Sequence, residues 1–312
     1  KEGRSQDAIV AYKKALSLKP DASWISKKLA GIYSGGLCVE DGAEVSNLHL
    51  FVPYYTPRDD IRAEELRYCL KKNLGSGLFT SITLIIDDDT EPPEADRRLS
   101  VLKVADRPTY LDWVRASRRR CPGQISILAN SDIYFDDSIG LLLELFKSNP
   151  NAFVALSRFE KNGSTLKPHP DPQWSQDTWA FMPERDGDLP AEPRLDVPMG
   201  APRCDNKIAY VFATEGYQVF NPVPYVRSMH VHETNLRYYD KRRDRRVIGG
   251  VAMVHPSETM LEPAKLDLEI WPISGGQMTG VQLNRTLEAW SEQDELAKQP
   301  RPTWIAHDED WQ

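Results

Sequence analysis

Long hydrophobic runs are missing from this sequence of 312 residues. The longest apolar stretches, such as Ser81–Ile86 and Ile125–Ala129, have the length of a β-strand, whereas a membrane-spanning helix needs roughly 18–20 consecutive apolar residues. We therefore expect no transmembrane segment. With 40% hydrophobic residues, the chain is long enough to bury a substantial core in one large or two smaller domains.

Cysteine is scarce: the four cysteines lie far apart and form no Cys-x-x-Cys pair. The length of 312 residues excludes a disulfide-stapled miniprotein, and this spacing argues against a zinc knuckle or a disulfide framework. Reduced structural thiols fit a cytoplasmic protein, with a place at the periphery of a membrane as the alternative. The first residue is Lys1 rather than methionine, so we expect the chain to be a fragment of a longer protein.

Basic residues are fewer than acidic residues in this sequence. The sequence has 39 Lys and Arg residues against 46 Asp and Glu residues, a formal net charge of −7. Its basic cluster, in residues 241–246, is typical of a solvated helix or loop, although it also suits a local anionic ligand. We therefore expect no nucleic-acid partner.

Residues 1–33 have apolar side chains at helical spacing. The spacing of Gly3, Ala8, Tyr12, Ala15 and Pro20 resembles the second helix of a tetratricopeptide repeat. Because such a repeat buries its apolar face only by stacking on others, the resemblance implies preceding repeats and a protein partner for this region. An unrelated amphipathic helix is the alternative.

Strands and helices alternate after the Gly35-Gly36 break, and the strands are continuous apolar runs. This pattern predicts an α/β fold in which helices cover both faces of a largely parallel sheet. Seven prolines between residues 160 and 200 predict a long irregular excursion, a feature that often forms a binding loop. We expect strands at Leu48–Val52, Ser81–Ile86, Ile125–Ala129 and Ala152–Leu156, and helices at Ile61–Leu74, Tyr110–Arg119, Ile139–Phe146 and Ile208–Thr214.

Polar residues follow three of the expected strands. The first strand ends in Pro53-Tyr54-Tyr55, the second in Asp87-Asp88-Asp89 and the third in Asn130-Ser131-Asp132. Because ligands of open α/β sheets bind outside the carboxyl ends of the strands, we expect the site at this edge. Converging carboxylates repel one another unless a cation or a donor-rich ligand neutralises them, as hard divalent metals do.

Residues 48–74 are similar to the opening of the GT-A glycosyltransferases, which have a Rossmann-like fold and use nucleotide-sugar donors. Ile85-Ile86-Asp87-Asp88-Asp89-Thr90 resembles the acidic motif with which that family holds the nucleoside, and Arg107-Pro108-Thr109-Tyr110 lies where its members have a further nucleotide contact. Leu128–Phe135 resembles the family's DxD motif, with Asn130 in place of the first acid. The resemblance implies donor binding by Pro53, Tyr55, Asp87, Asp88, Arg107, Asn130, Ser131 and Asp132.

In the DxD motif, carboxylates bridge Mn²⁺ or Mg²⁺ to the donor diphosphate, and an amide oxygen also ligates such hard cations. His230 and His232 point to the same side of an expected extended segment, because side chains alternate along a strand. GT-A enzymes often use a histidine near the end of the domain to complete the metal site. The resemblance thus implies a Mn²⁺ or Mg²⁺ site formed by Asp132, His230 and His232. A structural role for either histidine is the alternative.

Asp205 lies at the start of an apolar helix, in the segment Gly200–Lys207. This segment is similar to the one in which an acid of the GT-A family deprotonates the acceptor hydroxyl. A carboxylate at a helix N-terminus suits a general base, because a sugar hydroxyl is a poor nucleophile at neutral pH. Helix capping alone also explains an aspartate at this position.

Three further residues lie where GT-A enzymes often contact the acceptor or the donor sugar: Asp177, Trp179 and Asn206. Asp177 stands between the DxD-like motif and the helix that begins near Asp205. Trp174 and Trp179 fit stacking on a sugar face and packing in the core equally well, since buried tryptophan is common.

Together these features predict a partial repeat over residues 1–36, a GT-A-like domain over residues 46–255 and a C-terminal extension packed on it over residues 256–312. The predicted activity is metal-assisted, inverting transfer of a sugar from a nucleotide-sugar to a hydroxyl acceptor, as in polysaccharide biosynthesis. A nucleotidyltransferase is one alternative, but such enzymes usually have a Gly-rich, basic phosphate loop, which Val52–Asp60 lacks. A non-catalytic scaffold with a degenerate transferase domain is the other, and Asn130 favours it.

Overall fold

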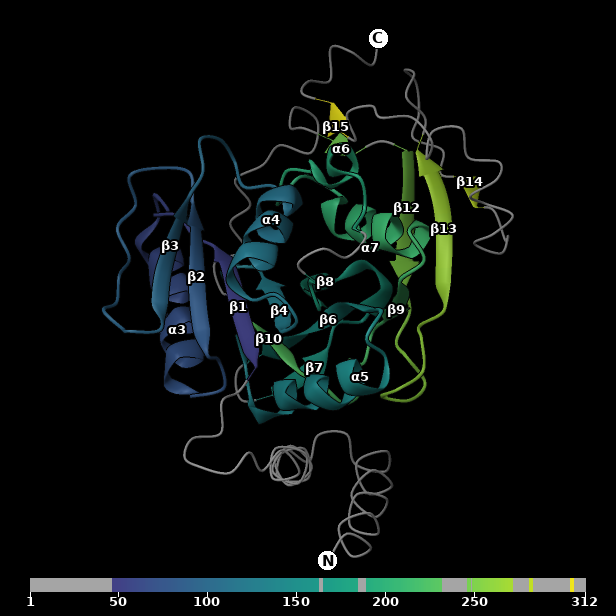
Figure 1. Cartoon of the computed structure of the whole chain (residues 1–312). Coiled ribbons are helices and arrows are strands. Elements are labelled where there is room, and N and C mark those ends of the chain that lie inside the picture. The colour runs from purple at the N-terminus through teal and green to yellow at the C-terminus, as the bar shows by residue number, and fades with distance from the viewer. Residues whose placement is uncertain are drawn as a thin grey trace, which may run out of the picture.

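The computed structural model describes residues 47–162, 165–184, 189–231, 246–247, 249–271, 281–282 and 304–305 (Figure 1). The tetratricopeptide-like segment predicted for residues 1–36 lies outside the described residues, and so does His232. Within the described part, no helix combines the length and the apolar character needed to cross a membrane.

One central sheet organises the described part of the chain. Its ten strands are β1 (Leu48–Pro53), β2 (Ser81–Ile86), β3 (Leu99–Lys103), β4 (Ile125–Ala129), β5 (Ile133–Phe135), β6 (Ala152–Asn162), β7 (Thr165–Pro168), β8 (Gln176–Phe181), β9 (Gln218–Phe220) and β10 (Ser228–His230). Neighbouring strands follow the order β3-β2-β1-β4-β8-β6-β10-β5, while β7 and β9 pair with β6. The first four strands of this order are parallel, and β8 runs antiparallel to both β4 and β6. The predicted α/β class with a mixed, largely parallel sheet is confirmed.

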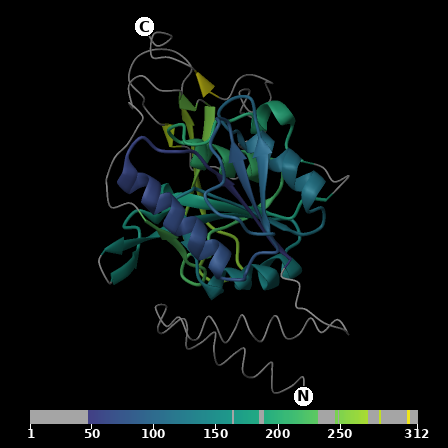
Figure 2. The same cartoon turned by 90° about the vertical axis from the view of Figure 1, so that its left-hand side faces the viewer.

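Helices cover both faces of this sheet, as predicted. They are α3 (Asp60–Gly75), α4 (Tyr110–Arg120), α5 (Leu142–Ser148), α6 (Glu192–Leu195) and α7 (Cys204–Thr214), with 3-10 turns η1 (Asp137–Leu141) and η2 (Pro172–Trp174). Leu50 and Val52 of β1 share a core with α3 and α5, whereas Phe51 between them shares a core with α4 and α7. Side chains alternate along a strand, so a strand covered on both faces is apolar throughout. Figure 2 shows α3 and α4 on opposite sides of the parallel strands.

Side-chain caps fix where the two helices nearest the parallel strands begin. Asp59 caps α3 and accepts a hydrogen bond from the backbone N–H of Arg62 at 2.9 Å. Thr109 and Asp112 form a reciprocal capping box at the start of α4. These side chains satisfy backbone N–H groups that the first turn of a helix leaves without a partner. Each helix therefore starts at a defined residue after the loop that precedes it.

The structure corrects the irregular excursion predicted for residues 160–200. That region contains β7 and β8, and all six residues of β8 are buried in the middle of the sheet. Prolines on both flanks hid this strand, which contains none itself. β3 was not predicted, because it is an edge strand without a fully buried residue. The helix expected at Ile139–Phe146 is split into the 3-10 turn η1, capped by Asp136, and α5.

A smaller sheet lies beside α7 (Figure 1). Its strands are β12 (Gly249–Val254), β13 (Leu266–Trp271) and β14 (Val281–Gln282), and β11 (Arg246–Val247) pairs separately with β15 (Trp304–Ile305). β12 and β13 are antiparallel, so the domain boundary expected at residue 255 falls within the hairpin that they form. Val251 and Val254 of β12 share a core with Ile208 and Phe212 of α7.

Gly250 offers a test of the contact between β12 and α7. A Cβ atom at Gly250 would overlap the buried ring of Tyr210 on α7. We expect Gly250→Ala to lower the free energy of unfolding by about 1–3 kcal/mol, because the ring or the strand must shift. Gly75→Ala is the control, since a Cβ atom there meets nothing within 4 Å. Urea denaturation compares the two variants, and equal stability would contradict the observed packing.

Candidate functional site

The carboxyl ends of the parallel strands meet at one edge of the central sheet. β1 pairs with β2 on one side and with β4 on the other. The strands that follow β1 in the chain, β2 and β3, extend the sheet to one side, whereas β4 extends it to the other side. Open α/β sheets bind ligands at such a switch point. The predicted donor-site residues lie at these strand ends or in the segments that follow them: Pro53, Tyr55, Asp87, Asp88, Arg107, Asn130, Ser131 and Asp132.

Hydrogen bonds tie together the loops after β1 and β2. The backbone N–H and the hydroxyl of Thr56 both lie 2.9 Å from Oγ1 of Thr90. Asp88 Oδ1 accepts from the backbone N–H of Thr90 at 2.9 Å. Asp87, Asp88 and Asp89 are all exposed. The second strand thus ends in a loop of fixed shape that carries three solvent-accessible carboxylates.

Arg107 links the segment after β3 to the segment before α7. Its Nε donates to the carbonyl oxygen of Met199 at 2.7 Å, and the backbone N–H of Met199 donates to the carbonyl of Pro108 at 2.8 Å. The neighbouring Gly200 has a φ of +73°, and a Cβ atom there would lie 2.7 Å from a guanidinium nitrogen of Arg107. Glycine allows both this backbone conformation and this close approach.

Asp132 belongs to a group of buried ion pairs. Its Oδ2 lies 2.5 Å from Nη2 of Arg62 and 3.3 Å from Nε2 of His230. Arg62, which lies on α3, also donates through Nη1 to Oε2 of Glu65 at 2.8 Å and to the carbonyl of Val231 at 3.4 Å. Arg62 therefore joins the first turn of α3 to the residues that follow β4 and β10.

The ion pairs continue from His230 to the middle of the sheet. His230 Nδ1 lies 2.9 Å from Oε2 of Glu160. The guanidinium of Arg158 donates to Oε1 of Glu160 at 2.6 Å and to Oδ2 of Asp177 at 2.8 Å. Asn130 Nδ2 then donates to Oδ1 of Asp177 at 2.8 Å. We call the connected charged residues the ion-pair chain: Glu65, Arg62, Asp132, His230, Glu160, Arg158 and Asp177.

The alternating charges shift the pKa values along this chain. Burial alone would lower the pKa of His230, but its hydrogen bonds to Asp132 and Glu160 raise the pKa to about 9. The hydrogen bond from His230, reinforced by one from Arg158, lowers the pKa of Glu160 to about 2. His230 is therefore an imidazolium at neutral pH, and both ring nitrogens carry protons that face carboxylates.

The described residues include two of the three predicted metal ligands, Asp132 and His230. Asp132 and His230 do lie together, but Asp132 shares one oxygen between Arg62 and His230. Among the residues that the structure describes, no three His, Cys, Asp or Glu side chains are grouped so that they could hold a metal ion. The third predicted ligand, His232, lies outside the described residues.

Asp205 lies in the first turn of α7, whose N-cap is Arg203. Asp205 is therefore not the N-cap residue, although its carboxyl group accepts hydrogen bonds from the backbone N–H groups of Asp205 and Asn206 in this turn. Burial, together with the negative charge of Asp177, raises the pKa of Asp205 to about 7, against hydrogen bonds from backbone N–H groups and the charge of Arg203, which lower it. Asp205, predicted as the general base, and Asp177, predicted as a sugar contact, are thus close enough for the two charges to interact. A carboxyl group of this pKa takes up and releases a proton near neutral pH.

Two predicted sugar contacts are corrected by the structure. Trp179 is only 2% exposed and packs edge-on against Tyr110, with 5.2 Å between ring centroids. Asn206 is 1% exposed, and its Nδ2 donates to the oxygens of Gln173, Gln176 and Ala252 at 3.0–3.3 Å. Both side chains are therefore buried inside the protein. Trp174, in contrast, is 38% exposed, so the structure separates the two tryptophans that the sequence left equivalent.

Sequence reasoning missed four members of the ion-pair chain: Arg62, Glu65, Arg158 and Glu160. Arg62 and Glu65 lie three residues apart on a helix, a spacing that usually indicates an exposed pair. Their position among the buried residues Leu66 and Leu70 of α3 was the available signal. Arg158 and Glu160 alternate along β6 and therefore share one face of the strand.

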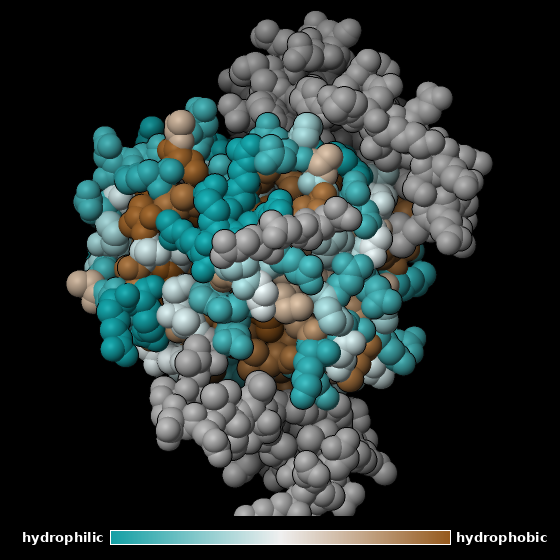
Figure 3. Space-filling model, viewed as in Figure 1, coloured by the Kyte–Doolittle hydropathy of each residue, from teal (hydrophilic) through white to brown (hydrophobic). Residues whose placement is uncertain are grey.

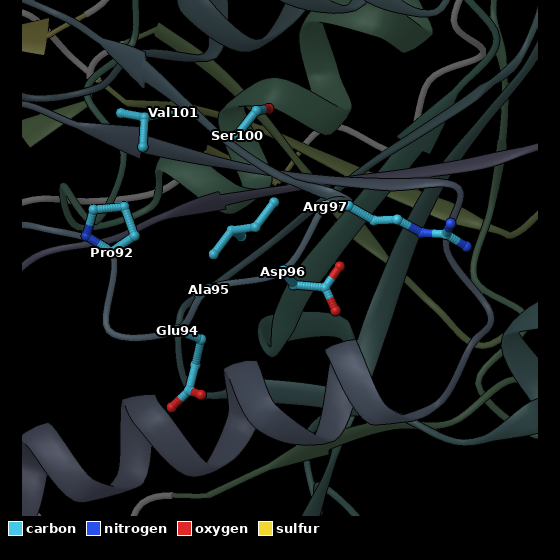
Figure 4. A pocket seen from close by; sticks show the side chains of 8 residues that line it. Pro92, Glu94, Ala95, Asp96, Arg97, Ser100 and Val101 are labelled. Carbon is cyan, nitrogen blue, oxygen red and sulfur yellow. The ribbon is translucent and has the colours of Figure 1, made fainter.

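The surface outside this site contains a shallow hollow beside β3. It has a volume of about 520 Å³ and is lined by residues 92–101, including Glu94, Asp96 and Leu99 (Figure 4). None of the predicted site residues lines it.

The face of the molecule seen in Figure 3 is mostly hydrophilic, with smaller hydrophobic patches between the polar residues.

Comparison by sequence found no matching protein-family model and no matching curated protein. Among solved structures, this chain is similar to the mannosyltransferase PcManGT from Pyrobaculum calidifontis in complex with GDP-Man and Mn²⁺, with 15% identity and a TM-score of 0.41 over 75% of this chain and 70% of that one. It is also similar to GalNAc-T7 with UDP, GalNAc and Mn²⁺, with 11% identity and a TM-score of 0.43 over 62% and 45% of the two chains.

A third similar structure is the 4-diphosphocytidyl-2C-methyl-D-erythritol synthase from Anaerococcus prevotii. It is 10% identical, with a TM-score of 0.31 over 47% of this chain and 81% of that one. All three TM-scores lie below 0.5. The function proposed below therefore rests on the residues and contacts of this chain.

The buried pair of Arg62 and Asp132 is open to a direct test. We expect Arg62→Met to lower the free energy of unfolding by about 3–5 kcal/mol, because Asp132 and Glu65 lose their shared cation in a buried position. The double variant Arg62→Met/Asp132→Asn is expected to cost less than the sum of the single changes.

Arg115→Met is the matched control, since Arg115 pairs with Glu192 at 2.6 Å on the surface, where such pairs contribute about 0–1 kcal/mol. Urea denaturation at pH 7 measures five proteins: the wild type, Arg62→Met, Asp132→Asn, the double variant and Arg115→Met. If Arg62→Met costs no more than Arg115→Met, the ion-pair chain does not stabilise the fold.

Proposed function

We propose that this chain is a GT-A-type glycosyltransferase, which transfers a sugar from a nucleotide-sugar donor to a hydroxyl group of an acceptor. The observation that supports it most is Asp205, a carboxyl group with a pKa near 7 whose charge interacts with that of Asp177. Asp177 is hydrogen-bonded to Asn130, which directly follows β4 at the switch point of the sheet. A candidate proton acceptor therefore lies next to the edge where an α/β sheet binds a nucleotide.

The donor nucleotide is proposed to bind across the carboxyl ends of β1, β2 and β3. Tyr55 offers a partly exposed aromatic ring after β1, and Asp87 and Asp88 offer exposed carboxylates after β2. Carboxylates accept hydrogen bonds from ribose hydroxyls, as the acidic residue of dinucleotide-binding folds does. Arg107 is exposed after β3, and its planar guanidinium suits a diphosphate oxygen pair.

In the proposed reaction, Asp205 takes the proton from the acceptor hydroxyl. The hydroxyl oxygen then forms a bond to the anomeric carbon of the donor sugar. The bond between that carbon and the diphosphate oxygen breaks, and its electron pair leaves with the nucleoside diphosphate. Attack from the side opposite the leaving group inverts the anomeric carbon. Arg107 is proposed to stabilise the charge that develops on the diphosphate.

A nucleotide-binding domain without turnover is the second candidate. Asn130 stands where the DxD motif has an acid, and its amide is hydrogen-bonded to Asp177. Asp132, the remaining acid, is paired with Arg62 and His230. This arrangement favours a structural role for the motif, and turnover distinguishes the two candidates.

Nucleotide binding is the first property to measure. We expect one of UDP, GDP, CMP or dTDP to raise the melting temperature of the protein, since a ligand at about 100 times its Kd stabilises by about 2.7 kcal/mol. Each nucleotide is tested with Mn²⁺ and with EDTA, so that a metal requirement is measured and not assumed. Arg107→Gln is expected to weaken the shift, whereas Arg115→Gln, remote from the strand ends, leaves it unchanged. Absence of a shift with all four nucleotides would contradict the proposed donor site.

Substitution of Asp205 tests the general base. We expect Asp205→Asn to lower kcat for sugar transfer by about 10²–10⁴-fold, the usual contribution of a positioned base. In the wild type, kcat/KM is expected to rise with pH to a plateau above about pH 7, because the base acts when ionised. An unchanged kcat in Asp205→Asn would contradict the proposal.

The same variant has an expected effect on stability. The pKa of Asp205 is raised in the folded state from 3.8 to about 7, so the folded state holds this proton more tightly and the contribution of Asp205 to stability falls as pH rises from about 4 to 7. The asparagine side chain of the variant has no such proton. Asp205→Asn is therefore expected to be more stable than wild type by at most about 4 kcal/mol above pH 7, with no such gain below pH 4. Urea denaturation of both proteins at pH 4 and pH 8 measures the difference, and an equal difference at the two pH values would contradict the raised pKa.

A further inference from the structure

Large hydrophobic side chains are exposed at three places in the described part of the chain: Ile61, Tyr68 and Trp174. Trp174 is the largest of them, and 38% of its surface is accessible. Tryptophan is usually buried to a high degree, and an exposed one near a functional site is a frequent binding contact. The residues around Trp174 therefore indicate which kind of ligand its ring is suited to bind.

Trp174 lies on a turn that hydrogen bonds hold tightly. It is the last residue of the 3-10 turn Pro172–Trp174. The carbonyl oxygen of Pro172 accepts hydrogen bonds from the side chains of Ser157 at 2.5 Å, Gln176 at 2.9 Å and Ser175 at 3.3 Å. An aromatic ring on a fixed turn loses little conformational freedom when a ligand binds, so the turn is suited to binding.

Arg203 fixes the ring from one side. Its guanidinium carbon lies 4.9 Å from the centre of the Trp174 ring, within the range of a cation–π contact. Among the described residues, Arg203 is also the one non-glycine residue with a positive φ, at 68°. Such a conformation costs about 1–3 kcal/mol and tends to be kept at functional sites. The strained residue and the exposed ring are thus in direct contact.

The platform formed by Trp174 and Arg203 lies beside the proposed base. Arg203 is the N-cap of α7 and precedes Asp205 by two residues. On the other side, the carbonyl oxygen of Gln173, next to Trp174, accepts from Nδ2 of Asn206, next to Asp205. The charge of Arg203 also contributes to the pKa of Asp205, which requires proximity.

We infer that Trp174 and Arg203 form the subsite for the acceptor and that the acceptor is a neutral sugar ring. This inference rests on the proposed function and extends it to the acceptor class. A pyranose has a face of C–H groups, which packs on the flat, electron-rich face of an indole, and a rim of hydroxyls, which reaches polar neighbours. A sugar on Trp174 has Asp205 beside it as proton acceptor. The carboxylate of Glu269 lies 3.6 Å from Arg203 and balances its positive charge. We therefore expect the sugar on this platform to carry no negative charge.

The platform is tested with Trp174→Ala, Trp174→Phe and the wild type. The probe is an array of defined neutral oligosaccharides, incubated with labelled protein and the nucleotide that raises its melting temperature. We expect the wild type to bind a subset of the array, Trp174→Ala to lose at least tenfold in affinity, and Trp174→Phe to retain affinity within about threefold. With the bound sugar as acceptor, Trp174→Ala raises KM tenfold or more, and kcat changes much less than KM.

Tyr68→Ala is the matched control, because Tyr68 is also 38% exposed but lies on α3, where it packs on Tyr134. It is expected to bind the array as the wild type does. No binding by the wild type, or equal binding by Trp174→Ala, would overturn the acceptor platform. Failure of the proposed function is seen separately, as the absence of a nucleotide-dependent melting shift in the wild type.

Discussion

Buried charge at the carboxyl edge of the sheet sets the conditions for the rest of the site. The ion-pair chain consists of four carboxylates and three cations, and each carboxylate lies against at least one cation. Arg158 and Glu160 are half-buried and the other five are buried, and a buried charge that loses its partner costs several kcal/mol. The elements that supply these charges, α3, β6, β8, β10 and the segment after β4, must therefore come together in one arrangement. A shift of β6 by one residue would turn Arg158 and Glu160 to the other face of the sheet.

Replacing such a network with apolar residues is often neutral or stabilising, so stability alone does not explain its presence. The function proposed here gives a reason. Asp177 is the last member of the chain, and its charge acts on Asp205. Arg158 and Asn130 share the two oxygens of Asp177 between them and so hold this carboxylate in a fixed position. The chain thereby connects the packing of α3 and β10 to the electrostatic environment of the proposed base.

The buried strands were predictable because the hydrophobic pattern of consecutive residues determines each of them. A strand buried on both faces is an apolar run, so three of the four parallel strands, β1, β2 and β4, were predicted almost to the residue. Their parallel arrangement brought the polar residues after them to one edge. β3 and β8 were missed because an edge strand is not a continuous apolar run and because prolines flank β8. The ion-pair chain was missed for another reason: its partners, such as Arg62 and Asp132, are 70 residues apart. Hydrophobic periodicity carries no information about such pairs, nor about which of two tryptophans faces solvent.

Asn130 illustrates the difference between a sequence pattern and the contacts that the fold creates. Read from the sequence, it is a departure from the DxD motif and favours a degenerate site. In the structure its amide donates to Asp177 at 2.8 Å, a position in which an aspartate would set two carboxylates against each other. The four carboxylates and three cations of the ion-pair chain already leave one net negative charge when His230 is protonated. A further carboxylate would add to the negative charge beside Asp177, whose charge already raises the pKa of Asp205. Asparagine at this position therefore avoids a repulsive pair of carboxylates next to the base that we propose.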